Sequence, residues 1–96
     1  MYAVVRSYSG PGARDLFGLL EDRKAEVEDL IRGVSGFRAY TILRTDEGGV
    51  SVTVCDDKTG TDESIQLARD WIAKNGADMA AAPPDVSEGT VILQLS

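Results

Sequence analysis

Apolar and polar residues alternate along residues 37–57, and this pattern predicts two strands joined by a tight turn. Val50, Val52 and Val54 alternate with small polar residues, which is the period of two that places successive side chains on opposite faces of a strand. Residues 46–49, Asp-Glu-Gly-Gly, supply the turn, because glycine adopts the positive φ angles of tight hairpins. We therefore expect an antiparallel hairpin as the organising element of the fold.

The register of this hairpin follows from the cost of burying an unpaired charge. A four-residue loop pairs Thr45 with Val50 and Leu43 with Val52, so that the valines share a face with neutral residues. A shift by one residue would place Arg38 on the valine face, where an unpaired buried charge is unfavourable. We therefore predict one aliphatic face and an opposite face that mixes aromatic residues with arginine.

Patterns elsewhere predict two more strands and two helical regions. Residues 2–8 predict the first strand, and residues 90–95 predict the last. Apolar positions at helical spacing predict helix over residues 13–34, as one long helix or as two short ones, because Gly18 and a charged middle interrupt the stripe. A second stripe predicts a helix from about residue 62 to residue 74.

This order of elements predicts an α+β fold in a single domain, residues 1–96. Strand, helix, strand, strand, helix, strand, joined by right-handed crossovers, forms a ferredoxin-like βαββαβ sandwich, a four-stranded antiparallel sheet with both helices on one face. We expect the helices to cover the aliphatic face. The opposite face is then too aromatic to be left to solvent, and we predict that it forms a homodimer interface through Val4, Arg6, Tyr40, Ile42 and Arg44.

Composition argues against several classes of partner. The 16 acidic and 10 basic residues give a net charge of −6, which repels nucleic acid phosphates and anionic membrane surfaces. No apolar run is long enough to cross a bilayer and the single cysteine cannot form an internal disulfide, so we expect a cytoplasmic protein. The absence of histidine removes imidazole catalysis and histidine ligation of metal or haem, and we expect no metal and no cofactor.

Three arginines are the least ordinary feature of this acidic chain. Arg6, Arg38 and Arg44 share one predicted sheet face with Tyr8 and Tyr40. They fit two roles. One is to hold an anionic aromatic ligand, and the other is to pair with acids across a dimer interface or to lie at its rim, where arginine and tyrosine are favoured.

The chain as a whole resembles the antibiotic biosynthesis monooxygenase-like group within the dimeric α/β-barrel superfamily. The features that carry the resemblance are the length, the Gly36-Phe37 entry to the second strand, the hairpin ending in Cys55-Asp56, and Trp71 on the second helix. The resemblance implies a homodimer in which two sheets face each other as a barrel. Some members oxidise polycyclic aromatic substrates without metal or flavin, some degrade haem, and many have no known activity.

Position by position, little of the group's chemistry carries over. Trp71 matches the helix tryptophan of catalytic members, but Leu67 stands where they place an asparagine one turn earlier, so the catalytic residues stay unknown. Haem-degrading members also need a ligating histidine and an asparagine on the first strand, and residues 2–8 contain neither. We therefore do not expect haem degradation.

Three classes of function remain open on the sequence. The first is a homodimer that binds a small aromatic or hydrophobic molecule without catalysis. The second is a cofactor-independent monooxygenase acting on a phenolic or polycyclic substrate, and the third is a structural or regulatory dimer. Because the resemblance implies a ligand pocket between helices and sheet, we take as candidate pocket residues Phe17, Leu20, Trp71, Tyr8, Tyr40 and Arg38.

Overall fold

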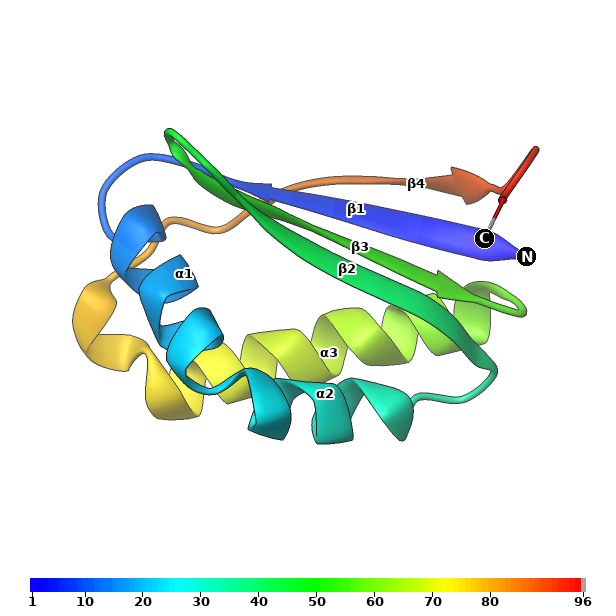
Figure 1. The fold of residues 1–96 in the computed structure, drawn as a ribbon, viewed down its shortest axis with the longest axis horizontal. Coiled ribbons are helices and arrows are strands. Elements are labelled where there is room, and N and C mark those ends of the chain that lie inside the picture. Colours follow the sequence, from blue (N-terminus) through cyan, green and yellow to red (C-terminus); the bar gives the residue numbers. More distant parts are fainter. Residues whose placement is uncertain (96) are drawn as a thin grey trace.

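The computed structural model describes residues 1–95 as a four-stranded antiparallel sheet with its helices on one face (Figure 1). The strands occur in the sheet order β2-β3-β1-β4 and are β1 (Tyr2–Tyr8), β2 (Phe37–Thr45), β3 (Gly48–Cys55) and β4 (Asp85–Thr90). The helices are α1 (Ala13–Asp22), α2 (Lys24–Arg32), α3 (Lys58–Asn75) and the 3-10 helix η1 (Ala77–Met79). The predicted ferredoxin-like α+β fold is confirmed.

The helices begin and end where the local sequence provides caps and breaks. The first helical region consists of two helices, because Arg23 between them has φ −111° and ψ 23°, outside the α-helical range. Helix α3 begins at Lys58, earlier than predicted, because the Asp57 side chain accepts a hydrogen bond from the backbone N–H of Thr59 and caps the helix. No helix among residues 1–95 has both the length and the apolar character needed to cross a membrane.

The hairpin has a shorter turn than predicted. Thr45 pairs with Gly48 and Leu43 pairs with Val50, so the turn contains two residues and the predicted pairs are wrong by two positions. Such a shift keeps every side chain on its predicted face. Gly48 and Gly49 are the first paired residues of β3, and they also leave room for α1: a Cβ atom at Gly49 would collide with the ring of Phe17.

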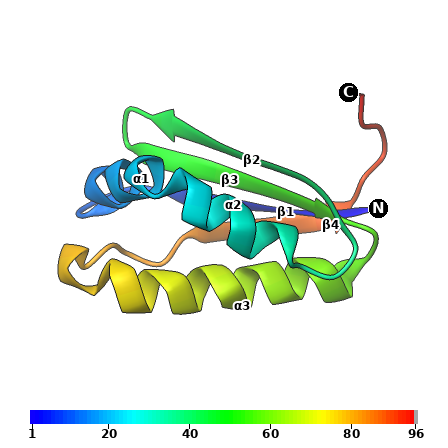
Figure 2. The same cartoon turned by 60° about the horizontal axis from the view of Figure 1, so that its bottom comes forward.

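The helices cover the opposite face of the sheet from the one predicted. Val4 is 0% exposed and Arg6 is 3% exposed, and the pairing register places them on one face with Tyr8, Tyr40, Ile42, Ser51, Thr53 and Cys55. We call this the covered face. The open face, turned away from the helices in Figures 1 and 2, carries Ala3, Val5, Thr41, Leu43, Val50, Val52 and Val54.

The predicted dimer interface of Val4, Arg6, Tyr40, Ile42 and Arg44 is therefore wrong. Four of these residues lie beneath the helices of the same chain, and Arg44 donates a hydrogen bond to Glu21 of α1. The prediction treated arginine as a residue that avoids the core. Large side chains are needed to fill the space between a sheet and its helices, and the tyrosines supply that volume while Ser51 provides Arg6 with a buried partner.

The predicted last strand over residues 90–95 is also wrong. Strand β4 pairs with β1 from Asp85 opposite Ser7 to Thr90 opposite Tyr2, the first residue of β1, and the ladder ends at that pair. The backbone N–H of Val91 still donates to the carbonyl of Met1 at 3.0 Å. Beyond it the chain leaves the sheet (Figure 2), with three exposed apolar residues, Ile92, Leu93 and Leu95.

Candidate functional site

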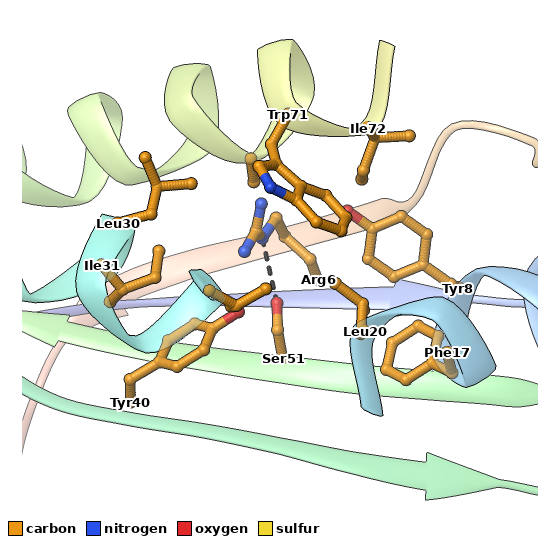
Figure 3. A pocket seen from close by; sticks show the side chains of 12 residues that line it. Arg6, Tyr8, Phe17, Leu20, Leu30, Ile31, Tyr40, Ser51, Trp71 and Ile72 are labelled. Carbon is orange, nitrogen blue, oxygen red and sulfur yellow. Dashed lines mark hydrogen bonds between the residues drawn. The ribbon is translucent and has the colours of Figure 1, made fainter. Parts of the chain in front are cut away.

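A small cavity lies between the helices and the covered face of the sheet (Figure 3). Its volume is about 30 Å³, which is room for about one water molecule. Helix α3 contributes Trp71 and Ile72, α1 contributes Phe17 and Leu20, and the remaining wall residues include Arg6, Tyr8, Leu30, Ile31, Tyr40 and Ser51. We call this space the inner cavity; its walls are mainly aromatic and aliphatic.

Arg6 is a buried cation at the floor of the inner cavity. Its Nε donates a hydrogen bond to Oγ of Ser51 at 3.0 Å, which orients the guanidinium toward Trp71 and away from β1 (Figure 3). The ion pairs among residues 1–95 are formed by other side chains, and no carboxylate in that range lies within 4.0 Å of Arg6. Because a buried charge without a counter-charge is unfavourable, Arg6 marks a position that favours an anion.

Tyr8 and Tyr40 flank Arg6 on the covered face. The Tyr8 ring meets the Phe17 ring edge-on, with centroids 5.6 Å apart and an interplanar angle of 61°. Burial raises the pKa of both phenols, and the nearby charge of Arg6 opposes that rise. Both hydroxyls are therefore protonated at neutral pH and can donate hydrogen bonds, but neither is suited to act as a general base.

Trp71 presents its indole ring to the cavity while its N–H is already bound. Nε1 donates to Oε1 of Glu26 at 3.0 Å, and Glu26 also accepts a hydrogen bond from Arg23 at 3.1 Å. The indole hydrogen bond and that of Arg23 lower the pKa of the Glu26 carboxyl group. Since Glu26 stays ionised at neutral pH, the indole ring is held in place and its N–H is not free for a ligand.

A larger cavity adjoins the inner cavity at Arg6, Tyr8 and Ile72. Its volume is about 330 Å³, within the range of small-molecule sites. It lies between α3, β1, β4 and the segment before β4, and the residues that line it but not the inner cavity are Leu16, Ile65, Arg69, Ala73, Ala81, Ala82, Pro83, Pro84 and Val86. We call this space the side cavity. Nothing in the sequence pattern indicated it, because it depends on where the segment 81–84 folds back.

The structure brings five of the six candidate pocket residues together around the inner cavity: Phe17, Leu20, Trp71, Tyr8 and Tyr40. The sixth, Arg38, does not line it. Arg38 is exposed and forms an ion pair with Asp56. The β-bulge between Phe37 and Ala39 breaks the alternation on which its placement depended. Arg6 lines the cavity in place of Arg38. The sequence signal that could have identified it is an arginine in the middle of a strand of apolar and aromatic residues.

Residues 1–95 contain no group of three or more histidine, cysteine, aspartate or glutamate side chains placed to hold a metal ion. The one cysteine, Cys55, is buried on the covered face. Burial and the neighbouring carboxylates raise the pKa of its thiol, so a reactive thiolate is disfavoured. The chemistry available at the candidate site is therefore that of arginine, phenol and indole.

No protein-family model matches the chain, and no curated protein matches it by sequence. Solved structures match over almost its whole length. A protein of unknown function from Nitrosomonas europaea superimposes with a TM-score of 0.72 and 19% identity, over 99% of this chain and 91% of the other.

Two further structures of this fold contain bound small molecules. The heme-degrading protein MhuD from Mycobacterium tuberculosis, solved with two hemes in its active site, matches with a TM-score of 0.68 and 19% identity over 100% of both chains. A monooxygenase from Streptomyces coelicolor, solved with the ligand nanaomycin D, matches with a TM-score of 0.64 and 18% identity, over 99% of this chain and 89% of the other. The chain therefore has the fold of the antibiotic biosynthesis monooxygenase-like proteins.

Proposed function

We propose that the protein binds a small aromatic or hydrophobic molecule between its helices and its sheet. The observation that supports this is the junction of the aromatic inner cavity with the side cavity of about 330 Å³ at Arg6 and Tyr8. The inner cavity alone accommodates one water, so the ligand lies mainly in the side cavity and places one edge against Tyr8. Two proteins of the same fold hold small molecules, heme in one and nanaomycin D in the other.

Isothermal titration calorimetry with bicyclic aromatic compounds tests this function. We expect saturable binding of at least one such compound, and about tenfold weaker binding by Tyr8→Ala, because the variant loses an aromatic wall shared by the two cavities. Leu43→Ala is the matched control, since Leu43 lies on the open face. Absence of binding by every compound, or equal binding by wild type and Tyr8→Ala, would contradict the proposal.

A cofactor-independent oxygenase is the second candidate, and Arg6 is the observation that favours it. Such a reaction needs an ionised phenol that can pass an electron to molecular oxygen, and a buried guanidinium stabilises a phenolate. An anthrone would consume one O₂, exchange a ring CH₂ for a carbonyl and release one water. Oxygen uptake by metal-stripped protein with an anthrone, lost in Arg6→Gln, supports this candidate; uptake no faster than in buffer contradicts it.

We also propose that the protein forms a homodimer through the open face. Val5, Val50 and Val52 are partly exposed there. On that face, the residues that β1, β2 and β3 contribute are all neutral. In a chain of net charge −6, a neutral aliphatic surface is the one on which two copies meet without repulsion. If the protein forms a dimer but binds no aromatic compound, the structural or regulatory class of function is the one that remains.

A further inference from the structure

We propose that the side cavity selects an aromatic carboxylic acid, whose carboxylate is held between Arg6 and Arg69. This inference rests on the proposed function, because it assigns the chemical class of the ligand to that same site. It goes further in making charge, and not only shape, the basis of selection.

The charges that line the side cavity have one sign. Arg6 reaches it from β1 and Arg69 from α3, and its other lining residues include no aspartate or glutamate. Neither arginine forms an ion pair with a carboxylate of residues 1–95. The chain has 16 acidic residues against 10 basic ones, so two cations around one cavity with no acid in its lining run against its overall charge. This local excess of positive charge favours an anionic ligand.

The two arginines differ in exposure, and the difference suggests separate roles. Arg6 is 3% exposed, its Nε is bound to Ser51 and its guanidinium also lies near the Tyr40 hydroxyl, which leaves the remaining guanidinium N–H groups to receive a carboxylate. Arg69 is exposed on α3, where it attracts the anion as it enters. Tyr8 lies within the electrostatic reach of both, since each lowers the pKa of its phenol against the effect of burial. Its protonated hydroxyl can donate to the same carboxylate.

The walls indicate that the anion carries an apolar body. Apart from Arg6, Arg69 and the Tyr8 hydroxyl, the lining consists of aliphatic side chains and the two prolines, Pro83 and Pro84. Such walls exclude water, which strengthens a charge-assisted hydrogen bond at the floor. An inorganic anion would not displace water from these apolar walls and would make no apolar contact with them. An aromatic acid fills them and places its ring beside Tyr8, at the junction with the inner cavity.

Calorimetric titration with 1-naphthoate and with its neutral analogue 1-naphthamide tests this selection, and inorganic phosphate serves as a third probe. We expect 1-naphthoate to bind about tenfold or more tightly than 1-naphthamide, because only the acid forms charge-assisted hydrogen bonds. Arg6→Gln should remove most of this preference. Arg69→Gln should weaken 1-naphthoate binding about fivefold and leave 1-naphthamide binding unchanged, because an exposed charge contributes less than a buried one.

The control is Arg32→Gln, since Arg32 is exposed on α2 beside Glu28 and away from the side cavity. It should bind both naphthalene compounds as wild type does. Arg69 is exposed, so Arg69→Gln keeps the test valid if Arg6→Gln does not fold. Equal binding of acid and amide would overturn charge selection while leaving the proposed function intact, and binding of neither would overturn both. Phosphate binding as tight as that of 1-naphthoate would overturn the aromatic class.

Discussion

The covered face of the sheet carries Arg6, Tyr8 and Tyr40, whereas the open face carries Val5, Val50 and Val52. Aliphatic burial alone favours the reverse, because burying a valine stabilises a fold by about 1.5 kcal/mol or more and burying a charge destabilises it. The observed arrangement gives the helices large side chains to pack against, and it buries the guanidinium of Arg6, which favours an anionic partner. We infer that the covered face is specialised for a ligand and the open face for association.

The largest expected effect comes from placing the same charge on each face at adjacent positions. Val4→Asp puts a carboxylate where the native side chain is 0% exposed, and we expect a loss of at least about 3 kcal/mol, a large part of the stability of a small domain, so the midpoint of the urea transition should fall sharply. Val5→Asp, on the open face, should leave that transition in place. Circular dichroism during urea titration measures both. Equal destabilisation by the two variants would show that the faces do not differ in burial.

The next effect concerns association through the open face. Val52→Lys places a charge at the centre of the neutral aliphatic surface, opposite Val5 and Thr41. We expect a shift from dimer to monomer in sedimentation velocity at tens of micromolar, because a desolvated contact does not tolerate an unpaired ammonium group. Val52→Ile serves as the control and should remain dimeric. A wild-type protein that sediments as a monomer would refute the role given to this face.

A smaller effect should arise when the buried cation is removed. Arg6→Met replaces a guanidinium that lacks an acidic partner among residues 1–95 with an apolar chain of similar length. We expect the variant to be about 1–2 kcal/mol more stable to urea, and to lose most of its preference for anionic ligands. Arg38→Met, which breaks an exposed ion pair, should change stability by less than about 1 kcal/mol. Marked destabilisation by Arg6→Met would mean that Arg6 serves the fold and not a ligand.

The smallest effect is a pH dependence at the rim of the site. The pKa of Glu26 is lowered in the folded protein, so its bond to Trp71 contributes above the unfolded pKa of about 4.3 and is lost as pH falls through the folded value. We expect the emission of Trp71 to shift over that acid range while far-ultraviolet circular dichroism stays constant. Glu26→Gln should lack this shift. An identical acid transition in the variant would assign it to another group.

The sequence predicted the order of elements and, apart from Arg38, the set of residues on each face of β1, β2 and β3, because periods of two and of 3.6 are local properties of the chain. It could not predict which face the helices would choose. Alternation and strand register place Val4 and Tyr40 on the same face of the sheet. Which face the helices cover depends on how the side chains of Phe17 and Trp71 pack against it. The last strand was misplaced because its extent depends on its partner: β1 pairs with residues 85–90 and not with residues 90–95.

The candidate site was predictable to the extent that it is made of large residues on regular elements. Helical spacing turned Phe17, Leu20 and Trp71 toward the sheet, and the family resemblance suggested a pocket there. Arg38 was misplaced because a bulge interrupts its strand, and Arg69 was missed because an exposed helix arginine has no distinguishing pattern. The side cavity requires the segment 81–84 to fold back over α3 and β1, a tertiary contact that no short stretch of sequence encodes.

The most direct test of the account is a nuclear magnetic resonance titration of ¹⁵N-labelled protein with 1-naphthoate. The indole N–H of Trp71 and the Nε–H of Arg6 report on the covered face, and the backbone amides of Val50 and Val52 report on β3 beside the open face. We predict that the Trp71 and Arg6 signals move along one saturation curve and shift more than the valine amides do. Movement of the Val50 and Val52 amides with the Trp71 and Arg6 signals unchanged would contradict a ligand site between the helices and the sheet.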